Sequence, residues 1–148
     1  MDPASIVGIV ASAATLAKLA LETATYLVGL KDSFNQMELH LLDLASRCQT
    51  LDIAWRRVHV WASASASNGA EEGMIFDQLR ISYEASNIIL NAINADIKKV
   101  ATAGKSSWRL SPKSKTRVLL HEKSLAAHGE RVNAQINSLN LLLSTAQL

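Results

Sequence analysis

The sequence predicts an all-α protein that folds as an antiparallel bundle of about four long helices, and three observations support this class. Apolar residues make up 49% of the 148 residues, with only six glycines and two prolines, and this composition favours helices. Apolar residues recur at alternating spacings of four and three along four stretches, each of roughly 25 to 35 residues. No stretch shows the period of two that a strand requires. An additional short helix is compatible with this pattern.

The first predicted helix runs from Pro3 to about Leu30, with Asp2 as its N-terminal cap. Proline suits the first helical position because the N–H that it lacks would be unpaired there, and an aspartate side chain can accept a hydrogen bond from the first turn. Small residues occupy the four-three positions along one side of the helix, so a neighbouring helix can approach closely. We therefore predict a helix-packing seam of Ala13, Ala17, Ala20 and Ala24.

The second and third predicted helices are separated by a break rich in serine, alanine and glycine. The second helix covers about Phe34–Trp61, and apolar residues follow the four-three spacing along it. The segment Ala62–Gly73 reads ASASASNGAEEG, a composition that indicates a loop. The third helix covers about Met74–Ala103, and we expect Gly104 to end it.

The fourth predicted helix begins near Pro112 and continues to the end of the chain. The connection before it, KSSWRLSPKSK, is polar and basic. With their near-heptad stripes, the four helices are expected to pack as a bundle around one core, not in the steeper crossings of a globin.

The length fits a single domain, which at this size buries roughly 68–70% of the surface that its unfolded chain exposes. Asp2 stands where a secretory signal peptide would carry Lys or Arg, and Cys48 is the only cysteine. Both features favour a reducing, cytoplasmic location. Because the helical pattern is uncapped at Leu148, residues 1–148 are expected to form one N-terminal domain of a longer protein.

The sequence provides no catalytic, cofactor or metal site that we can identify. Gly104, Lys105 and Ser106 look like the end of a phosphate-binding loop, but the glycine that such a loop needs earlier is absent. Cys48 lies on an apolar stripe and is interpreted as a small buried hydrophobe. The four histidines, His40, His59, His121 and His128, are interpreted as structural or surface residues. We expect neither an enzyme nor a cofactor.

Basic residues gather around the third connection without an acid among them. One interpretation is an ordinary solvated turn. Another is a patch for anionic membrane lipid, in which each basic residue contributes roughly 1 kcal/mol and a tryptophan anchors the interface. Nucleic acid ranks last, because a single aromatic residue interleaves the charges. The lipid patch would comprise Lys98, Lys99, Lys105, Trp108, Arg109, Lys113, Lys115 and Arg117.

The first helix carries no charge from Pro3 to Ala17, a length short of the roughly 20 residues that a stable membrane span needs. Lys18 and Glu22 would each cost up to about 2.5–3.5 kcal/mol at mid-bilayer. A single copy would therefore insert weakly, and several copies would have to associate. The alternative is that the alanine seam simply packs within the bundle. The apolar anchors of an inserting helix would be Ile6, Val7, Ile9, Val10 and Leu16.

Three segments carry a resemblance to a known family: residues 1–34 at the start, RCQTLDIAW, and ERVNAQINSLNLLLS near the end. Together they resemble the HeLo-like N-terminal domains of fungal NLR-like signal-transducing NTPases and ankyrin-repeat proteins. The resemblance implies a soluble helical bundle that forms a homo-oligomer on activation, moves from the cytoplasm to the plasma membrane, and inserts its first helix to drive regulated cell death. The inserting segment would then be about Pro3–Leu21.

The competing interpretation is a helical adaptor that oligomerises or docks a helical protein partner without contacting lipid. It predicts an exposed apolar groove, for which the region around Trp55 and Trp61 is the candidate.

Overall fold

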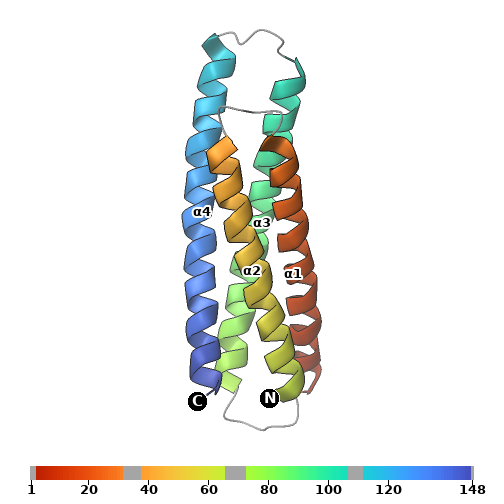
Figure 1. Ribbon diagram of the computed structural model, residues 1–148. Coiled ribbons are helices and arrows are strands. Elements are labelled where there is room, and N and C mark those ends of the chain that lie inside the picture. Colours follow the sequence, from red (N-terminus) through yellow and green to blue (C-terminus); the bar gives the residue numbers. More distant parts are fainter. Residues whose placement is uncertain (1–2, 32–37, 66–72, 107–111, 148) are drawn as a thin grey trace.

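The computed structural model describes residues 3–31, 38–65, 73–106 and 112–147, with side chains over residues 7–30, 39–64, 74–99 and 123–146. These residues form four helices and no strand, so the predicted all-α bundle is confirmed. Consecutive helices run in opposite directions along the bundle (Figure 1). The helices are α1 (Pro3–Lys31), α2 (Glu38–Ser65), α3 (Gly73–Ser106) and α4 (Pro112–Gln147).

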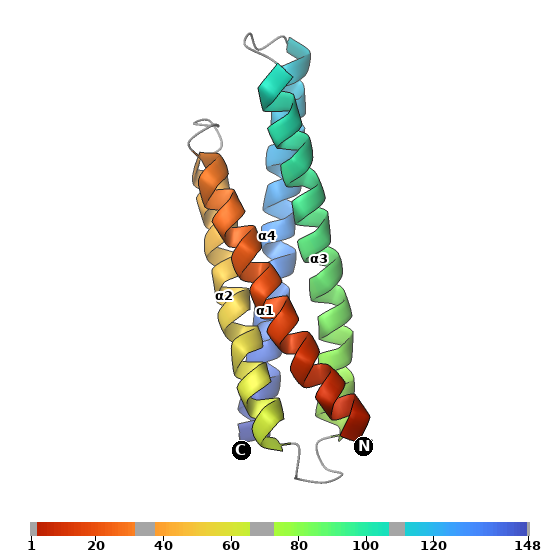
Figure 2. The ribbon, with the colours of Figure 1, turned by 90° about the vertical axis from the view of Figure 1, so that its right-hand side faces the viewer.

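The order of the helices around the bundle differs from their order in the chain. α1 packs against α2 and α3, and α4 packs against the same two helices. Figures 1 and 2 show that α2 and α3, although consecutive, lie across the bundle from each other. α3 and α4 also extend beyond the other two helices at the end opposite the N-terminus. α1 therefore covers one side of the bundle, and no other described helix packs on the outer side of α1.

Two predicted helix boundaries are wrong. The segment predicted as a loop from Ala62 begins as helix, because α2 continues to Ser65 and the side chain of Ala62 is fully buried. Gly104 does not end α3, which continues to Ser106. A glycine inside a helix costs only about 0.5–1 kcal/mol relative to alanine, so neighbouring packing can carry a helix past it. Pro112 begins α4 as predicted.

The core is formed by one apolar stripe from each helix. Tryptophan, phenylalanine, leucine and isoleucine fill its centre, and alanines of α1 and α2 fill the space where these two helices pack most extensively. The largest side chains with almost no exposed surface are Leu16, Leu27, Leu41, Leu44, Leu51, Trp55, Phe76, Leu79, Leu90, Ile93 and Ile97.

A polar contact joins α2 to α4 at the edge of this core. The Nη1 group of Arg47 donates a hydrogen bond of 2.8 Å to the carbonyl oxygen of Gly129. The same guanidinium lies 3.0 Å from Asp43. A Cβ atom at position 129 would lie 3.4 Å from Cδ of Arg47, an ordinary van der Waals distance, so the arginine side chain passes directly over this position of α4.

Candidate functional site

The predicted membrane anchors of α1 are divided between the core and the surface. Ile9 and Leu16 are buried, with 7% and 1% of their surface exposed, and Val10 is half-buried. Val7 is 65% exposed, and the side chain of Ile6 lies outside the described residues. Insertion of this helix would therefore require its buried half to leave the bundle.

The four alanines of the predicted seam all lie in the core. Ala13, Ala17, Ala20 and Ala24 are each at most 3% exposed. They lie on the side of α1 that packs on its neighbours, where small side chains allow two helix backbones to approach closely.

Two polar side chains on other helices hold α1 in place. His59 on α2 lies with Nδ1 2.9 Å from the carbonyl oxygen of Val10, and because a carbonyl can only accept, Nδ1 carries the proton. Asn94 on α3 donates through Nδ2 to Oγ1 of Thr23 at 3.1 Å, and this hydroxyl donates to the carbonyl of Leu19 at 2.8 Å. Neither contact follows from a local sequence pattern, since each joins residues 49 or more positions apart.

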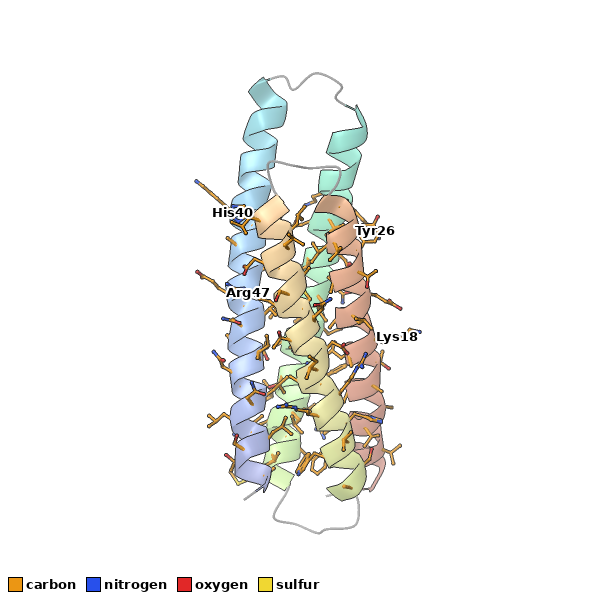
Figure 3. All side chains as sticks on the ribbon, viewed as in Figure 1. Lys18, Tyr26, His40 and Arg47 are labelled. Atoms are coloured by element: carbon orange, nitrogen blue, oxygen red, sulfur yellow. The ribbon has the colours of Figure 1, made fainter. Side chains whose placement is uncertain are left out.

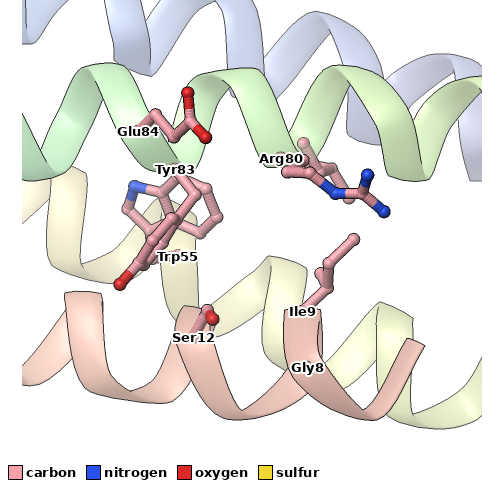
Figure 4. A pocket seen from close by; sticks show the side chains of 8 residues that line it. Gly8, Ile9, Ser12, Trp55, Arg80, Tyr83 and Glu84 are labelled. Carbon is pink, nitrogen blue, oxygen red and sulfur yellow. The ribbon is translucent and has the colours of Figure 1, made fainter. Parts of the chain in front are cut away.

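A hollow of about 410 Å³ lies beside Trp55, between α1 and α3. Trp55 is 1% exposed and packs edge-on against Tyr83, with ring centroids 6.4 Å apart. Figure 4 shows these two rings at one end of the hollow and Arg80 with Ile9 at the other. The indole Nε1 of Trp55 is buried and has no hydrogen-bond partner among the described residues. This unpaired N–H reduces the stability that the chain gains from packing the Trp55 ring.

A second, larger hollow of about 900 Å³ lies between α2 and α4 beside Trp61. Trp61 is half-buried and stacks on Phe76, with centroids 5.1 Å apart. Exposed Ile53 and Val60 contribute apolar surface at this hollow, and Arg56 and Arg57 contribute positive charge. The structure thus places a hollow beside each of the two tryptophans that the adaptor interpretation named.

The predicted anionic-lipid patch is described only in part. Lys98 and Lys99 are exposed near the C-terminal end of α3, at the opposite end of the bundle from the start of α1 (Figure 1). The intact bundle therefore does not bring this end of α3 together with the N-terminal turns of α1. The remaining members lie in helices with undescribed side chains (Lys105, Lys113, Lys115, Arg117) or outside the described residues (Trp108, Arg109).

A partly buried polar cluster joins α3 to α4. Nε2 of His128 lies 2.6 Å from Oδ2 of Asp96, and the hydroxyl of Ser124 donates to the same oxygen at 2.8 Å. Burial raises the pKa of Asp96. The hydrogen bonds from His128 and Ser124, together with the nearby positive charges, lower this pKa by more than burial raises it, so the pKa lies below its ordinary value. Because Ser124 contacts the carboxylate and not His128, the cluster lacks the serine–histidine contact of a nucleophilic relay.

Cys48 is fully buried, as its position on the apolar stripe predicts. Burial raises the pKa of its thiol to about 12, which keeps the thiol protonated and unreactive at neutral pH. Among the side chains that the structure describes, no group of three or more histidine, cysteine or acidic residues is placed to hold a metal ion.

Comparisons with known proteins give no match: no protein family model, no curated protein and no solved structure resembles the chain closely enough to be assigned to it. The class that the fold itself defines is a four-helix bundle with an apolar first helix. Its candidate functional features are that helix and the two hollows beside the tryptophans.

Proposed function

We propose that the chain is a signalling or effector domain that rests as a soluble bundle and, when clustered, releases α1 into a membrane to drive regulated cell death, as in fungal NLR-like systems. The observation that carries the proposal is the apolar character of α1 on both sides. Among the described residues, Val7–Leu30 is the only helical stretch long and apolar enough to cross a membrane. Only 39% of its most apolar window is buried, whereas the core helix of a soluble protein is mostly buried.

The packing of α1 accounts for a resting state. Ile9, Leu16 and Leu27 are its large buried side chains, and burial of such a side chain contributes roughly 1.5–3 kcal/mol. Together they contribute roughly 5–9 kcal/mol, comparable with the whole stability of a domain, about 5–15 kcal/mol. Spontaneous release of α1 is therefore rare, and an event such as clustering has to compensate for the lost contacts.

Insertion also has a cost that favours several copies over one. Lys18 and Glu22 are the only charged residues between Val7 and Leu30, and each costs about 2.5–3.5 kcal/mol near the centre of a bilayer. Helices that associate in the membrane can shield such groups from lipid. The small residues of the seam, once outside the bundle, provide a surface on which copies of α1 can pack.

A vesicle-leakage assay with the clustered chain tests this proposal. The chain is fused to a trimerising coiled coil and added to dye-loaded vesicles that contain phosphatidylserine. Val7→Glu and Leu21→Glu place a charge on the exposed side of α1 without disturbing the core, since these residues are 65% and 38% exposed. Ile81→Glu on α3 is the matched control, because Ile81 is 68% exposed.

We expect leakage from the clustered wild type and the Ile81→Glu control, and loss of leakage in both α1 variants. Circular dichroism checks that all variants keep the helical fold. Absence of leakage from the clustered wild type, or equal leakage from all variants, contradicts the proposal.

The second candidate function is a helical adaptor, and the hollow between α2 and α4 favours it. Exposed Ile53 and Val60 combined with Arg56 and Arg57 suit an amphipathic helix with acidic flanks. Titration with a designed acidic amphipathic peptide tests this function. Ile53→Glu should abolish the interaction and Ile81→Glu should preserve it; no binding to the wild type counts against the adaptor.

A further inference from the structure

The outer side of α1 has the spacing of a helix-packing surface, although no other helix of the described chain covers it. Its exposed positions alternate by four and three residues, as in the seam of a coiled coil. Of these positions, Lys18 alone is charged. They are Val7, Ala11, Ala14, Lys18, Leu21, Thr25 and Val28, all of which are exposed. A surface helix normally presents polar residues on the side opposite the core, so this apolar outer side requires another explanation.

The C-terminal half of this surface is hollowed. A depression of about 580 Å³ is lined by Leu21, Thr25, Tyr26 and Gly29, together with Glu22 and Leu30. A Cβ atom at position 29 would meet nothing within 4 Å, so the fold of one chain does not require a glycine there. Glycine in a helix costs about 0.5–1 kcal/mol relative to alanine and is suited to close approach by another backbone. Gly29 therefore fits a surface that a second helix approaches.

The charges on this surface are complementary to those on a second copy of the same surface. Lys18 and Glu22 are exposed, and Figure 3 shows Lys18 and Tyr26 pointing away from the bundle. Neither Lys18 nor Glu22 has an ion pair among the described side chains. If two copies of α1 pack antiparallel about a two-fold axis level with Ala20, Lys18 of each copy faces Glu22 of the other. The same axis places Ala11 opposite Gly29, so a small residue meets the hollow.

We propose that the outer side of α1 is a homodimer interface in which two resting bundles pack antiparallel through two symmetric Lys18–Glu22 ion pairs. Parallel packing in register is disfavoured, because it would bring Lys18 against Lys18 and Glu22 against Glu22. One helix face is smaller than the roughly 1,200–2,000 Å² of a standard interface, so the dimer is expected to be weak and concentration-dependent. The inference concerns the chain in solution and does not depend on membrane activity.

Charge reversal at positions 18 and 22 tests both whether this interface forms and whether its two α1 helices run antiparallel. Lys18→Glu and Glu22→Lys each turn both ion pairs into repulsive pairs, and each variant alone should dissociate at least about tenfold more readily than the wild type. An equimolar mixture of the two variants should recover the dimer. In the mixed dimer, two acidic side chains on the Lys18→Glu chain face two basic side chains on the Glu22→Lys chain, so both pairs are again attractive. Sedimentation equilibrium measures the three samples, with Arg131→Glu on α4 as the control for a change in net charge.

A second variant tests the hollow independently of charge. Gly29→Leu fills open space in the single chain, so it should keep the fold by circular dichroism while raising the dissociation constant of the dimer at least about tenfold.

Several outcomes overturn the proposal: a wild type that stays monomeric at high concentration, whether or not it binds phosphatidylserine vesicles; a mixture that fails to recover the dimer; or a dimer that Arg131→Glu weakens as strongly as Lys18→Glu. Persistence of the dimer in Gly29→Leu also overturns it. A wild type that dimerises more tightly than either single variant establishes the antiparallel arrangement, because parallel packing in register would place like charges together in the wild type as well.

Discussion

Nε2 of His128 lies 2.6 Å from Oδ2 of Asp96, and this contact joins α4 to α3 inside the bundle. His128 is only 4% exposed, and its other ring nitrogen, Nδ1, is buried and has no partner in the part of the chain that the structure describes. Asp96 therefore provides the one hydrogen bond that this imidazole makes among the described residues. The stability of the α3–α4 interface depends on the charge state of Asp96.

The first prediction concerns acid. The pKa of Asp96 in the folded chain lies below its ordinary value, which is about 3.9 in an unfolded chain. The ionised carboxylate thus contributes stability that is fully present above pH about 4 and is lost as pH falls through the lowered pKa. Urea unfolding at a series of pH values should show this loss for the wild type and a smaller loss for Asp96→Asn. Asp77→Asn, at an exposed position of α3, should follow the wild type; identical profiles for all three chains would exclude Asp96 as the cause.

The second prediction concerns the three-residue cluster. Asp96→Ala leaves buried His128 without its acceptor and should lower the free energy of unfolding by about 1–3 kcal/mol. Ser124→Ala removes one hydrogen bond to the same oxygen and should cost about 0.5–1.5 kcal/mol. The double variant should cost less than the sum, because both changes act on one carboxylate. Ser138→Ala, at an exposed site on α4, should change stability by less than about 0.5 kcal/mol. Additive costs would show that Ser124 does not act through the carboxylate of Asp96.

The sequence predicted the cores of the four helices well, because each core stripe is a local pattern along one helix. Cys48, for example, lies three and four positions from Leu51 and Leu44, and all three are buried. The end of α2 was missed because Ala62 continues the stripe of Trp55 and Val58 into a segment whose composition resembles a loop. The burial of Ala62 therefore extends α2 into a segment whose composition favours a loop.

The polar contacts between helices could not be predicted in the same way. Asp96 and His128 are 32 positions apart on two helices, and their contact depends on the rotation and offset of α3 against α4. The order of the helices around the bundle is similarly absent from any local pattern. The one available signal was the spacing of four between Ser124 and His128, which places both on one side of α4.

The third prediction concerns the alanine seam. Ala20 has no exposed surface, so Ala20→Leu forces α1 away from its neighbours and should destabilise the bundle by about 1–3 kcal/mol. Ala126→Leu makes the same chemical change at an exposed position of α4 and should alter stability by less than about 0.5 kcal/mol. Urea unfolding at micromolar concentration measures both. A tolerated Ala20→Leu would show that α1 does not pack tightly.

The fourth prediction concerns the reactivity of Cys48. Its thiol has no exposed surface, and burial raises its pKa to about 12, so at neutral pH it is both protonated and shielded. A thiol-specific chromogenic reagent should therefore react only as fast as the chain opens, and urea should accelerate the reaction strongly. Ser63→Cys in a Cys48→Ala background places a thiol at an exposed position of the same helix and should react at once. If Cys48 in the native chain reacted as fast as this variant, α2 would have to separate from the core far more often than its packing allows.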